Sequence, residues 1–167
     1  MIAQRGFPAV SRLLSSQFTV VGNVGAGTDS LMAYTLAANT LKRNGDALRI
    51  FCAGRCNNNA NAKQVGLAMG VAGLMLIGLQ NLTVSIDGSW VIDSLLIRRS
   101  ATHFYFGTSL IAGTSGGAVA EHKIQVGNEG PAMNLETTAY AITAQAVGVD
   151  DNDVTQTMMF VEYVPAP

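Results

Sequence analysis

Short segments in which large apolar residues alternate with small or polar ones run along most of the chain, and turn-forming residues separate them. A period of two places successive side chains on opposite faces of a β-strand, so these segments are typical of strands that bury one face. Their close, regular spacing is typical of β-sandwiches and barrels. We expect strands at residues 18–21, 30–36, 47–55, 64–71, 74–77, 89–99, 102–111, 121–126, 138–147 and 155–164.

This series of strands predicts an all-β fold, an antiparallel β-sandwich of jelly-roll type with about eight to ten strands. The 167 residues suit one domain with a core of its own, which we place at residues 18–167. Residues 1–17 differ, because Arg5 and Arg12 have no acidic partner in this segment and a proline interrupts it. We interpret them as an extended N-terminal arm with one helical turn over residues 10–15.

The uncharged stretch at residues 65–79 raises the alternative of a membrane helix. In its first part, Val65, Leu67 and Met69 alternate with glycine and alanine, which indicates a strand. The stretch is also shorter than the roughly 18 to 20 residues that a span needs, so we expect no membrane contact. The small residues on its second face either let another surface approach closely or fill a tight sandwich core, and both interpretations stay open.

Charge is scarce, because charged residues make up 13% of the chain against about 25% in typical soluble domains, whereas 49% of the residues are hydrophobic. A monomer with so few charges would expose large apolar patches. Partner subunits that cover part of the surface would resolve this shortage, so we expect an oligomer. The net charge of −1 argues against a general nucleic-acid binder.

The sequence offers little for catalysis, and we expect no enzymatic activity and no cofactor. His103 and His122 are the only histidines, and neither lies in the His-x-His pattern of metal-dependent cupins. The glycine-rich run at residues 22–27 lacks the Gly-Lys-Ser/Thr ending of a phosphate-binding loop. Cys52 and Cys56 are too far apart along a strand for an easy disulfide and too few for zinc, so a buried free thiol is expected at Cys52.

The run Asp150, Asp151, Asn152 and Asp153 has two interpretations. Clustered carboxylates and amides hold Ca²⁺ in many proteins, although the spacing here does not match an EF-hand loop. The same residue types are common turn formers. Whether these residues bind calcium therefore stays open at this stage.

The sequence DSLMAYTLAANTL at residues 29–41 is followed by NGDALRI at residues 44–50. Together they resemble a strand-turn-strand pattern of small jelly-roll structural proteins of tailed-bacteriophage virions. The sequences DGSWVI at residues 87–92 and DNDVTQ at residues 151–156 are similar to later parts of the pattern. The resemblance spans about residues 28–164 and rests on turn and strand signatures, not on functional sites.

This resemblance implies a homotrimer that serves as a head decoration (cement) protein or as a domain of a fibre. Because only a short arm precedes the body, the leading hypothesis is a capsid decoration protein on the outer surface of the virion. The arm would then bind the major capsid protein through Arg5 and Arg12, with Phe7, Leu13 and Leu14 as apolar contacts. Deleting residues 1–17 is expected to leave a folded trimer that no longer binds capsids.

The alternative is a receptor- or glycan-binding jelly-roll domain of a fibre. Glycan sites usually stack a sugar on an exposed aromatic ring. Most of the candidate rings lie within expected strands and are better explained as core or interface residues. These candidates are Trp90, Tyr34, Phe104, Tyr105, Phe106, Tyr140 and Tyr163.

Overall fold

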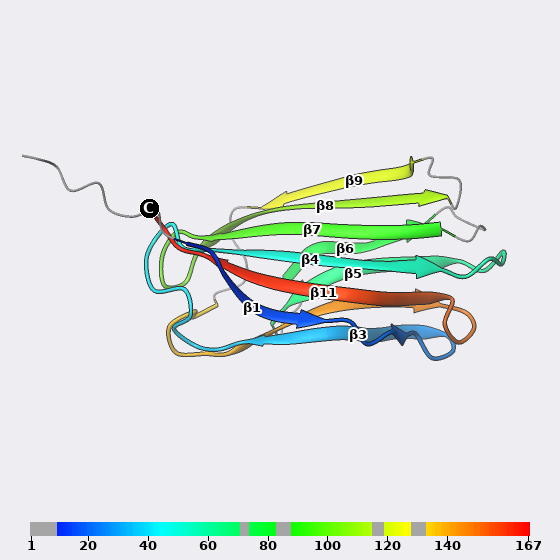
Figure 1. The fold of residues 1–167 in the computed structure, drawn as a ribbon, viewed down its shortest axis with the longest axis horizontal. Helices are drawn as coiled ribbons and strands as arrows, with labels where there is room; N and C mark the ends of the chain where they lie inside the picture. Colours follow the sequence, from blue (N-terminus) through cyan, green and yellow to red (C-terminus); the bar gives the residue numbers. More distant parts are fainter. Residues whose placement is uncertain (1–9, 71–73, 83–87, 115–118, 128–132) are drawn as a thin grey trace, which may run out of the picture.

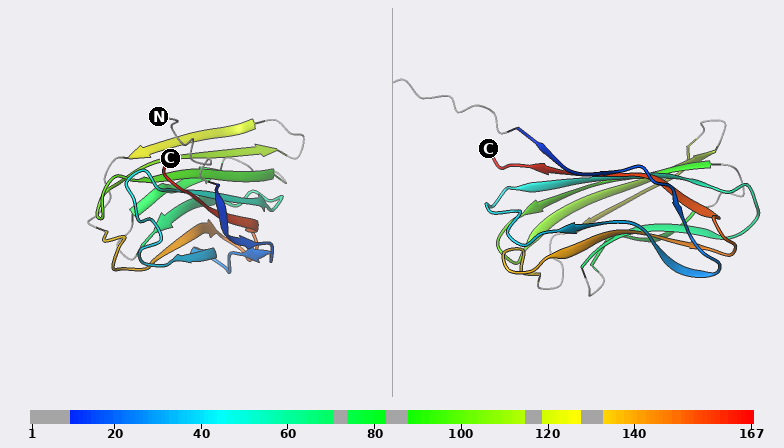
Figure 2. Two further views of the ribbon diagram at one scale, coloured as in Figure 1. Left: turned by 60° about the vertical axis from the view of Figure 1, so that its left-hand side comes forward. Right: turned by 60° about the horizontal axis from the view of Figure 1, so that its bottom comes forward.

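A computed structural model of the chain consists of two antiparallel β-sheets packed face to face (Figures 1 and 2). It describes residues 10–70, 74–82, 88–114, 119–127 and 133–167. The strands are β1 (Arg12–Gln17), β2 (Val21–Gly22), β3 (Gly27–Leu36), β4 (Ala47–Cys56), β5 (Lys63–Met69), β6 (Leu74–Leu82), β7 (Gly88–Arg98), β8 (Phe104–Thr114), β9 (Val119–Gly127), β10 (Tyr140–Gly148) and β11 (Val154–Val164). The expected all-β sandwich is confirmed.

The strand order is that of a jelly roll with an added hairpin. The larger sheet has the order β1-β11-β4-β7-β8-β9, with β2 also paired to β11, and the smaller sheet has the order β3-β10-β5-β6. Four pairs nest inside one another along the chain: β1 with β11, β3 with β10, β4 with β7, and β5 with β6. Strands β8 and β9 lie outside this nest and extend the larger sheet beyond β7 (Figure 1).

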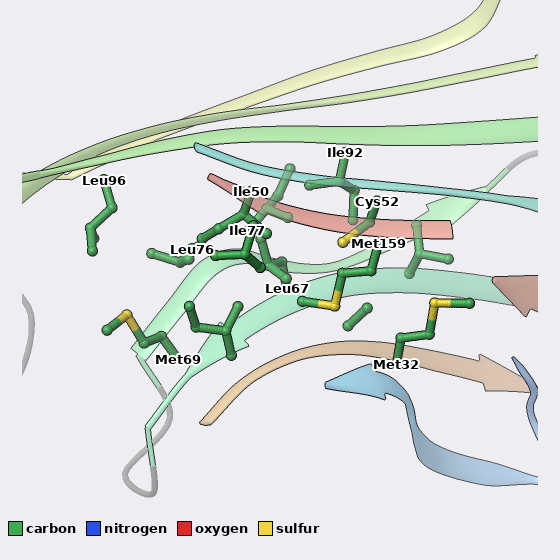
Figure 3. Close-up of a cluster of buried hydrophobic side chains, with 14 of the residues drawn as sticks. Met32, Ile50, Cys52, Leu67, Met69, Leu76, Ile77, Ile92, Leu96 and Met159 are labelled. Atoms are coloured by element: carbon green, nitrogen blue, oxygen red, sulfur yellow. The ribbon is translucent and has the colours of Figure 1, made fainter. Parts of the chain in front are cut away.

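The core lies between the two sheets and follows the alternation of the strands (Figure 3). Val65, Leu67 and Met69 are fully buried, so the uncharged stretch contributes a core strand, as its period of two predicts. On the second face, a Cβ atom on Gly66 would lie 3.0 Å from the carbonyl oxygen of Ile77 in β6. This small residue therefore permits a close approach between two strands of one sheet. The described residues contain no helix long and apolar enough to cross a membrane.

Three glutamine side chains connect the two sheets. At one open edge of the sandwich, Gln17 of β1 donates a hydrogen bond to a carbonyl oxygen of β3 over 2.7 Å. At the opposite edge, Gln125 of β9 donates to Met75 of β6 over 2.9 Å and accepts from Gly78 over 3.0 Å. Between them, the buried Gln156 of β11 accepts a 2.8 Å hydrogen bond from a backbone amide of β3. These amides satisfy backbone groups that the sheets themselves leave unpaired.

The N-terminal segment differs from the expectation. Residues 12–17 form the edge strand β1, paired antiparallel with β11, so the predicted helical turn over residues 10–15 is wrong. Leu14 packs against the core, which fixes β1 to the sandwich. The expected strand at residues 18–21 is also shorter, because only Val21–Gly22 pairs there. The part of the predicted arm from Arg12 onward thus belongs to the larger sheet.

The two cysteines are free, and both are buried. Cys52 of β4 faces the core, and Cys56 is the last residue of the same strand. Burial raises the pKa of Cys52 to about 12 and that of Cys56 to about 11. The expected buried free thiol at Cys52 is confirmed.

Candidate functional site

The outer face of the larger sheet carries a row of charged side chains beside a row of aromatic ones. Because strand register places residues side by side, Glu162 of β11 lies opposite Arg49 of β4. In the next row, Phe160 of β11 lies opposite Phe51, which in turn lies opposite Asp93 of β7. All five residues are exposed or half-buried, so both rows are accessible from solvent.

Arg49 and Asp93 form a two-point ion pair at the centre of this face. Arg49 donates from Nε to Oδ1 of Asp93 over 3.1 Å and from Nη2 to Oδ2 over 2.8 Å. These hydrogen bonds, followed by the charges of Asp93 and Glu162, raise the pKa of Arg49. The two side chains remain 54% and 37% exposed, so the pair contributes less than about 1 kcal/mol to stability and keeps donors and acceptors available to a partner.

Three phenylalanines cluster next to the ion pair. The ring of Phe160 contacts Phe18 edge to face at a centroid distance of 5.3 Å, and Phe51 lies 6.2 Å away on the other side. Phe18 is 61% exposed, although it is a large apolar side chain. Such rings on the outside of a sheet offer an apolar surface to a ligand.

Two shallow hollows flank Arg49. One, of about 400 Å³, is lined by Leu13, Arg49, Phe51, Phe160 and Glu162, and we call it the aromatic hollow. The other, also of about 400 Å³, lies towards β8 and β9, and we call it the serine hollow. The serine hollow is lined by Arg49, Asp93, Leu95, Gly107, Thr108, Ser109 and Ile124. An apolar lining with a few placed charges is the usual character of a ligand site.

The residues predicted to bind the capsid lie partly in this region. Arg12 and Leu13 are exposed on β1, with the guanidinium of Arg12 6.0 Å from the centre of the Tyr163 ring. Leu13 also lines the aromatic hollow. Leu14 packs against the core of its own chain, as described above. Arg5 and Phe7 lie outside the described residues.

Of the aromatic rings proposed for glycan stacking, most are buried and cannot stack with a ligand. Those rings are Trp90, Phe104, Phe106 and Tyr140. Tyr34 and Tyr163 are half-buried, and Tyr105 is exposed. The sequence reasoning missed Phe51 and Phe160. Parity offers a signal for both, because Phe51 shares a strand face with Arg49, and Phe160 shares one with Glu162.

The acidic run at residues 150–153 is built as a turn. The carboxylate of the fully buried Asp153 accepts four hydrogen bonds, from the side chains of Asn59 and Asn61 and from the backbone amides of Val149 and Asp150. Donors that point at both carboxylate oxygens occupy the positions that a cation would need. Among the described residues no cluster of three or more metal-binding side chains occurs. The turn interpretation therefore explains this run.

The two histidines lie apart from this site. His103 precedes β8, where its Nδ1 lies 2.9 Å from the hydroxyl of Thr102 and 3.1 Å from that of Ser100. His122 is exposed on the outer face of β9.

No family model matches the chain, and no curated protein matches it. Among solved structures, it is similar to the CBM2 module of the evolved Dit protein of Lactobacillus casei BL23 phage J-1, with 8% identity and a TM-score of 0.40. That match covers 88% of this chain and 76% of the module. A second match is the metal-free lectin I-B4 of Griffonia simplicifolia, with 11% identity, a TM-score of 0.27 and coverage of 92% and 98%. Likenesses this weak decide neither family nor ligand.

Proposed function

We propose that the chain is a non-enzymatic carbohydrate-binding module that holds a sugar in the aromatic hollow. The observation that carries this proposal is the charged row of Arg49 and Glu162 directly beside the aromatic row of Phe51 and Phe160. A pyranose has an apolar face of C–H groups and an edge of hydroxyls. One ring face on the phenylalanines would place its hydroxyl edge next to the charged row.

The charged side chains can both donate hydrogen bonds to sugar hydroxyls and accept hydrogen bonds from them. Arg49 offers guanidinium donors, whereas Glu162 offers carboxylate acceptors, and a sugar hydroxyl both donates and accepts. Hydrogen bonds to ionised groups are stronger than neutral ones. At about 400 Å³ the hollow lies within the usual range of small-molecule sites, about 300 to 1,000 Å³, and it is open to solvent.

A phage virion is the proposed setting of this module. That part rests on the resemblance of the strand and turn signatures to virion jelly rolls, not on the geometry of the hollow. Binding without catalysis fits the described residues, in which the histidines lie away from the hollow and the carboxylate of Asp93 is engaged by Arg49. A receptor-binding role on a host surface is therefore proposed ahead of a capsid role.

The test is a glycan array probed with the purified chain, followed by titration of the strongest hit. Phe160→Ala is expected to weaken binding by about tenfold, because the ring face supplies a stacking surface. Arg49→Gln should weaken it by a similar factor through lost charged hydrogen bonds. Thr35→Ala, exposed on the smaller sheet and outside the hollow, is the control and should bind as wild type. An array without specific hits, or hits insensitive to both variants, would refute the proposal.

A second candidate is the trimeric capsid decoration protein suggested by the sequence. The specific observation in its favour is the exposed apolar surface on β8 and β9, where Ile124 and Val126 are 69% and 75% exposed.

The deletion test of this candidate has to spare β1. Because residues 12–17 are part of the sheet, deleting residues 1–17 would remove a strand. Deleting residues 1–9 is the sharper test, since it removes Arg5 and Phe7 and keeps β1. Unchanged capsid occupancy would refute the arm's role, and electron microscopy of virions would locate the protein.

A further inference from the structure

The β8–β9 hairpin is an addition to the nested strand pairs of the jelly roll, and it is held firmly. Gln125 ties the inner face of β9 to β6 through two hydrogen bonds. The register of β8 with β7 runs unbroken from Phe104 to Thr114. The outer face of the hairpin is therefore a rigid surface that the core itself does not require.

This outer face is largely apolar, although the exposed His122 of β9 also lies on it. We call it the apolar strip, and its exposed large side chains are Leu95, Tyr105, Ile111, Val119, Ile124 and Val126. Their exposed fractions amount to roughly 600 Å², at the upper end of the patches that monomers tolerate and most of the ~800 Å² that each partner gives to a standard interface. Among the described residues of β8 and β9, the register places no Lys, Arg, Asp or Glu on this face. The guanidinium of Arg99, which precedes β8, lies 5.6 Å from the centre of the Tyr105 ring at one end of the strip.

The strip has both a protrusion and a recess. Ile124, 69% exposed on β9, protrudes and forms one wall of the serine hollow, whose lining also includes Gly107 and Ser109 of β8. A Cβ atom on Gly107 would meet its nearest neighbour, Val126, at 3.9 Å, an ordinary van der Waals distance, so the hollow has room above this glycine. The protrusion and the recess thus lie side by side on one face of the same chain.

We propose that a second copy of this chain covers the apolar strip, with Ile124 of each copy seated in the serine hollow of the other. When knob and recess adjoin on one face, a two-fold axis lets both contacts form at once, which is the self-complementarity of an isologous interface. The rim of the hollow carries the ion pair of Arg49 and Asp93, whose opposite charges cancel, so bringing two hollows together adds no net charge from this pair to the interface. Because the strip carries few charges, it offers little electrostatic complementarity to a strongly charged partner.

This inference does not rest on carbohydrate binding, because the aromatic hollow lies on the other side of Arg49. The test measures the molar mass of the full chain by light scattering over a wide range of protein concentration. Wild type is expected to associate, and Ile124→Lys is expected to shift to the mass of one chain. Thr35→Lys, on the exposed face of edge strand β3 in the smaller sheet, is the matched control and should associate as wild type.

A second measurement does not depend on how the variant folds. Because association stabilises the folded state by mass action, the melting temperature of wild type should rise with protein concentration. A wild type of single-chain mass at every concentration, with a constant melting temperature, overturns the proposal. So does an Ile124→Lys protein that associates as strongly as wild type. Carbohydrate titration of the same variant keeps the two proposals separate, since monovalent sugar binding should be unchanged.

Discussion

Asp153 is a residue at which a small chemical change should strongly destabilise this fold. Its buried carboxylate accepts hydrogen bonds from Asn59 and Asn61 in the β4–β5 loop and from the amides of Val149 and Asp150 in the β10–β11 loop. It therefore joins two loops that are far apart in the sequence. Asp153→Asn keeps the shape but presents an NH₂ group where donors already point inward.

The size of the effect follows from the donors left without an acceptor. Each unsatisfied buried donor costs about 1 to 3 kcal/mol, and hydrogen bonds to an ionised group are at the upper end. The fully buried Lys63 belongs to the same network, because its ammonium donates to Oδ1 of Asn59 over 2.6 Å while Asn59 donates to Asp153. Losing the negative charge of Asp153 removes an anion from the network that holds this buried cation. We expect Asp153→Asn to lower the free energy of unfolding by about 3 to 5 kcal/mol.

The effect should also depend on pH. Burial alone would raise the pKa of Asp153, but the hydrogen bonds from Asn59 and from the loop outweigh burial and hold this pKa well below its usual range. A depressed pKa in the folded state gives stability that is present above the unfolded pKa of about 3.9 and is lost as the pH falls below it. The difference between wild type and Asp153→Asn should therefore be constant near neutrality and shrink below about pH 4.

Urea denaturation of both proteins at a series of pH values measures this difference. Asp151→Asn is the control in the same turn, since Asp151 is exposed and accepts a hydrogen bond from the backbone amide of Gly25 over 2.7 Å. It should cost less than about 1 kcal/mol. A cost below about 1 kcal/mol for Asp153→Asn at neutral pH, or a difference that persists unchanged in acid, would refute the reasoning.

Three further predictions concern the core. Gly54→Ala should destabilise the folded protein by about 3 kcal/mol in thermal melts, because the added Cβ would overlap a carbonyl oxygen of β11 and the buried indole of β7. The control, Gly107→Ala, should change stability by less than about 0.5 kcal/mol. Gln156→Leu should lower the free energy of unfolding in urea by about 1 to 3 kcal/mol, because it leaves a buried backbone amide of β3 without its acceptor. Cys52 and Cys56, buried and with raised pKa values, should resist thiol reagents until the protein unfolds.

The sequence predicted the strands well, because their pattern is local. Alternation in residues 47–55 and 89–99 marks β4 and β7 nearly to their ends, and the buried positions of β5 follow the parity of Val65. The strand β1 was missed because its six residues lack this alternation. It exists through pairing with β11, whose residues follow it by more than a hundred positions, and such a contact has no local signal.

The candidate site was beyond sequence reasoning for the same physical reason. Parity alone places Phe51 and Phe160 on outward faces, but only the register of β4 with β11 makes them neighbours. Gln125 and Gln156 were also invisible as links between sheets, because a glutamine in a strand is ordinarily a surface residue. Their role depends on which backbone groups of the opposite sheet are left unpaired, and this follows from bulges and edges that form only in the complete fold.

The two proposals have a joint consequence for binding to surfaces. A shallow hollow open to solvent is expected to bind one sugar weakly, whereas each copy that associates through the apolar strip adds a further hollow to the assembly. Linked sites raise the effective concentration for the second contact, so a surface dense in glycans would be held far more tightly than a free sugar. Ile124→Lys should then lose binding to an immobilised, multivalent glycan while its affinity for the soluble monovalent sugar stays at the wild-type value. Equal loss on both ligands would mean that the strip and the hollow act as a single site, contrary to the separation of Ile124 from the aromatic hollow by Arg49.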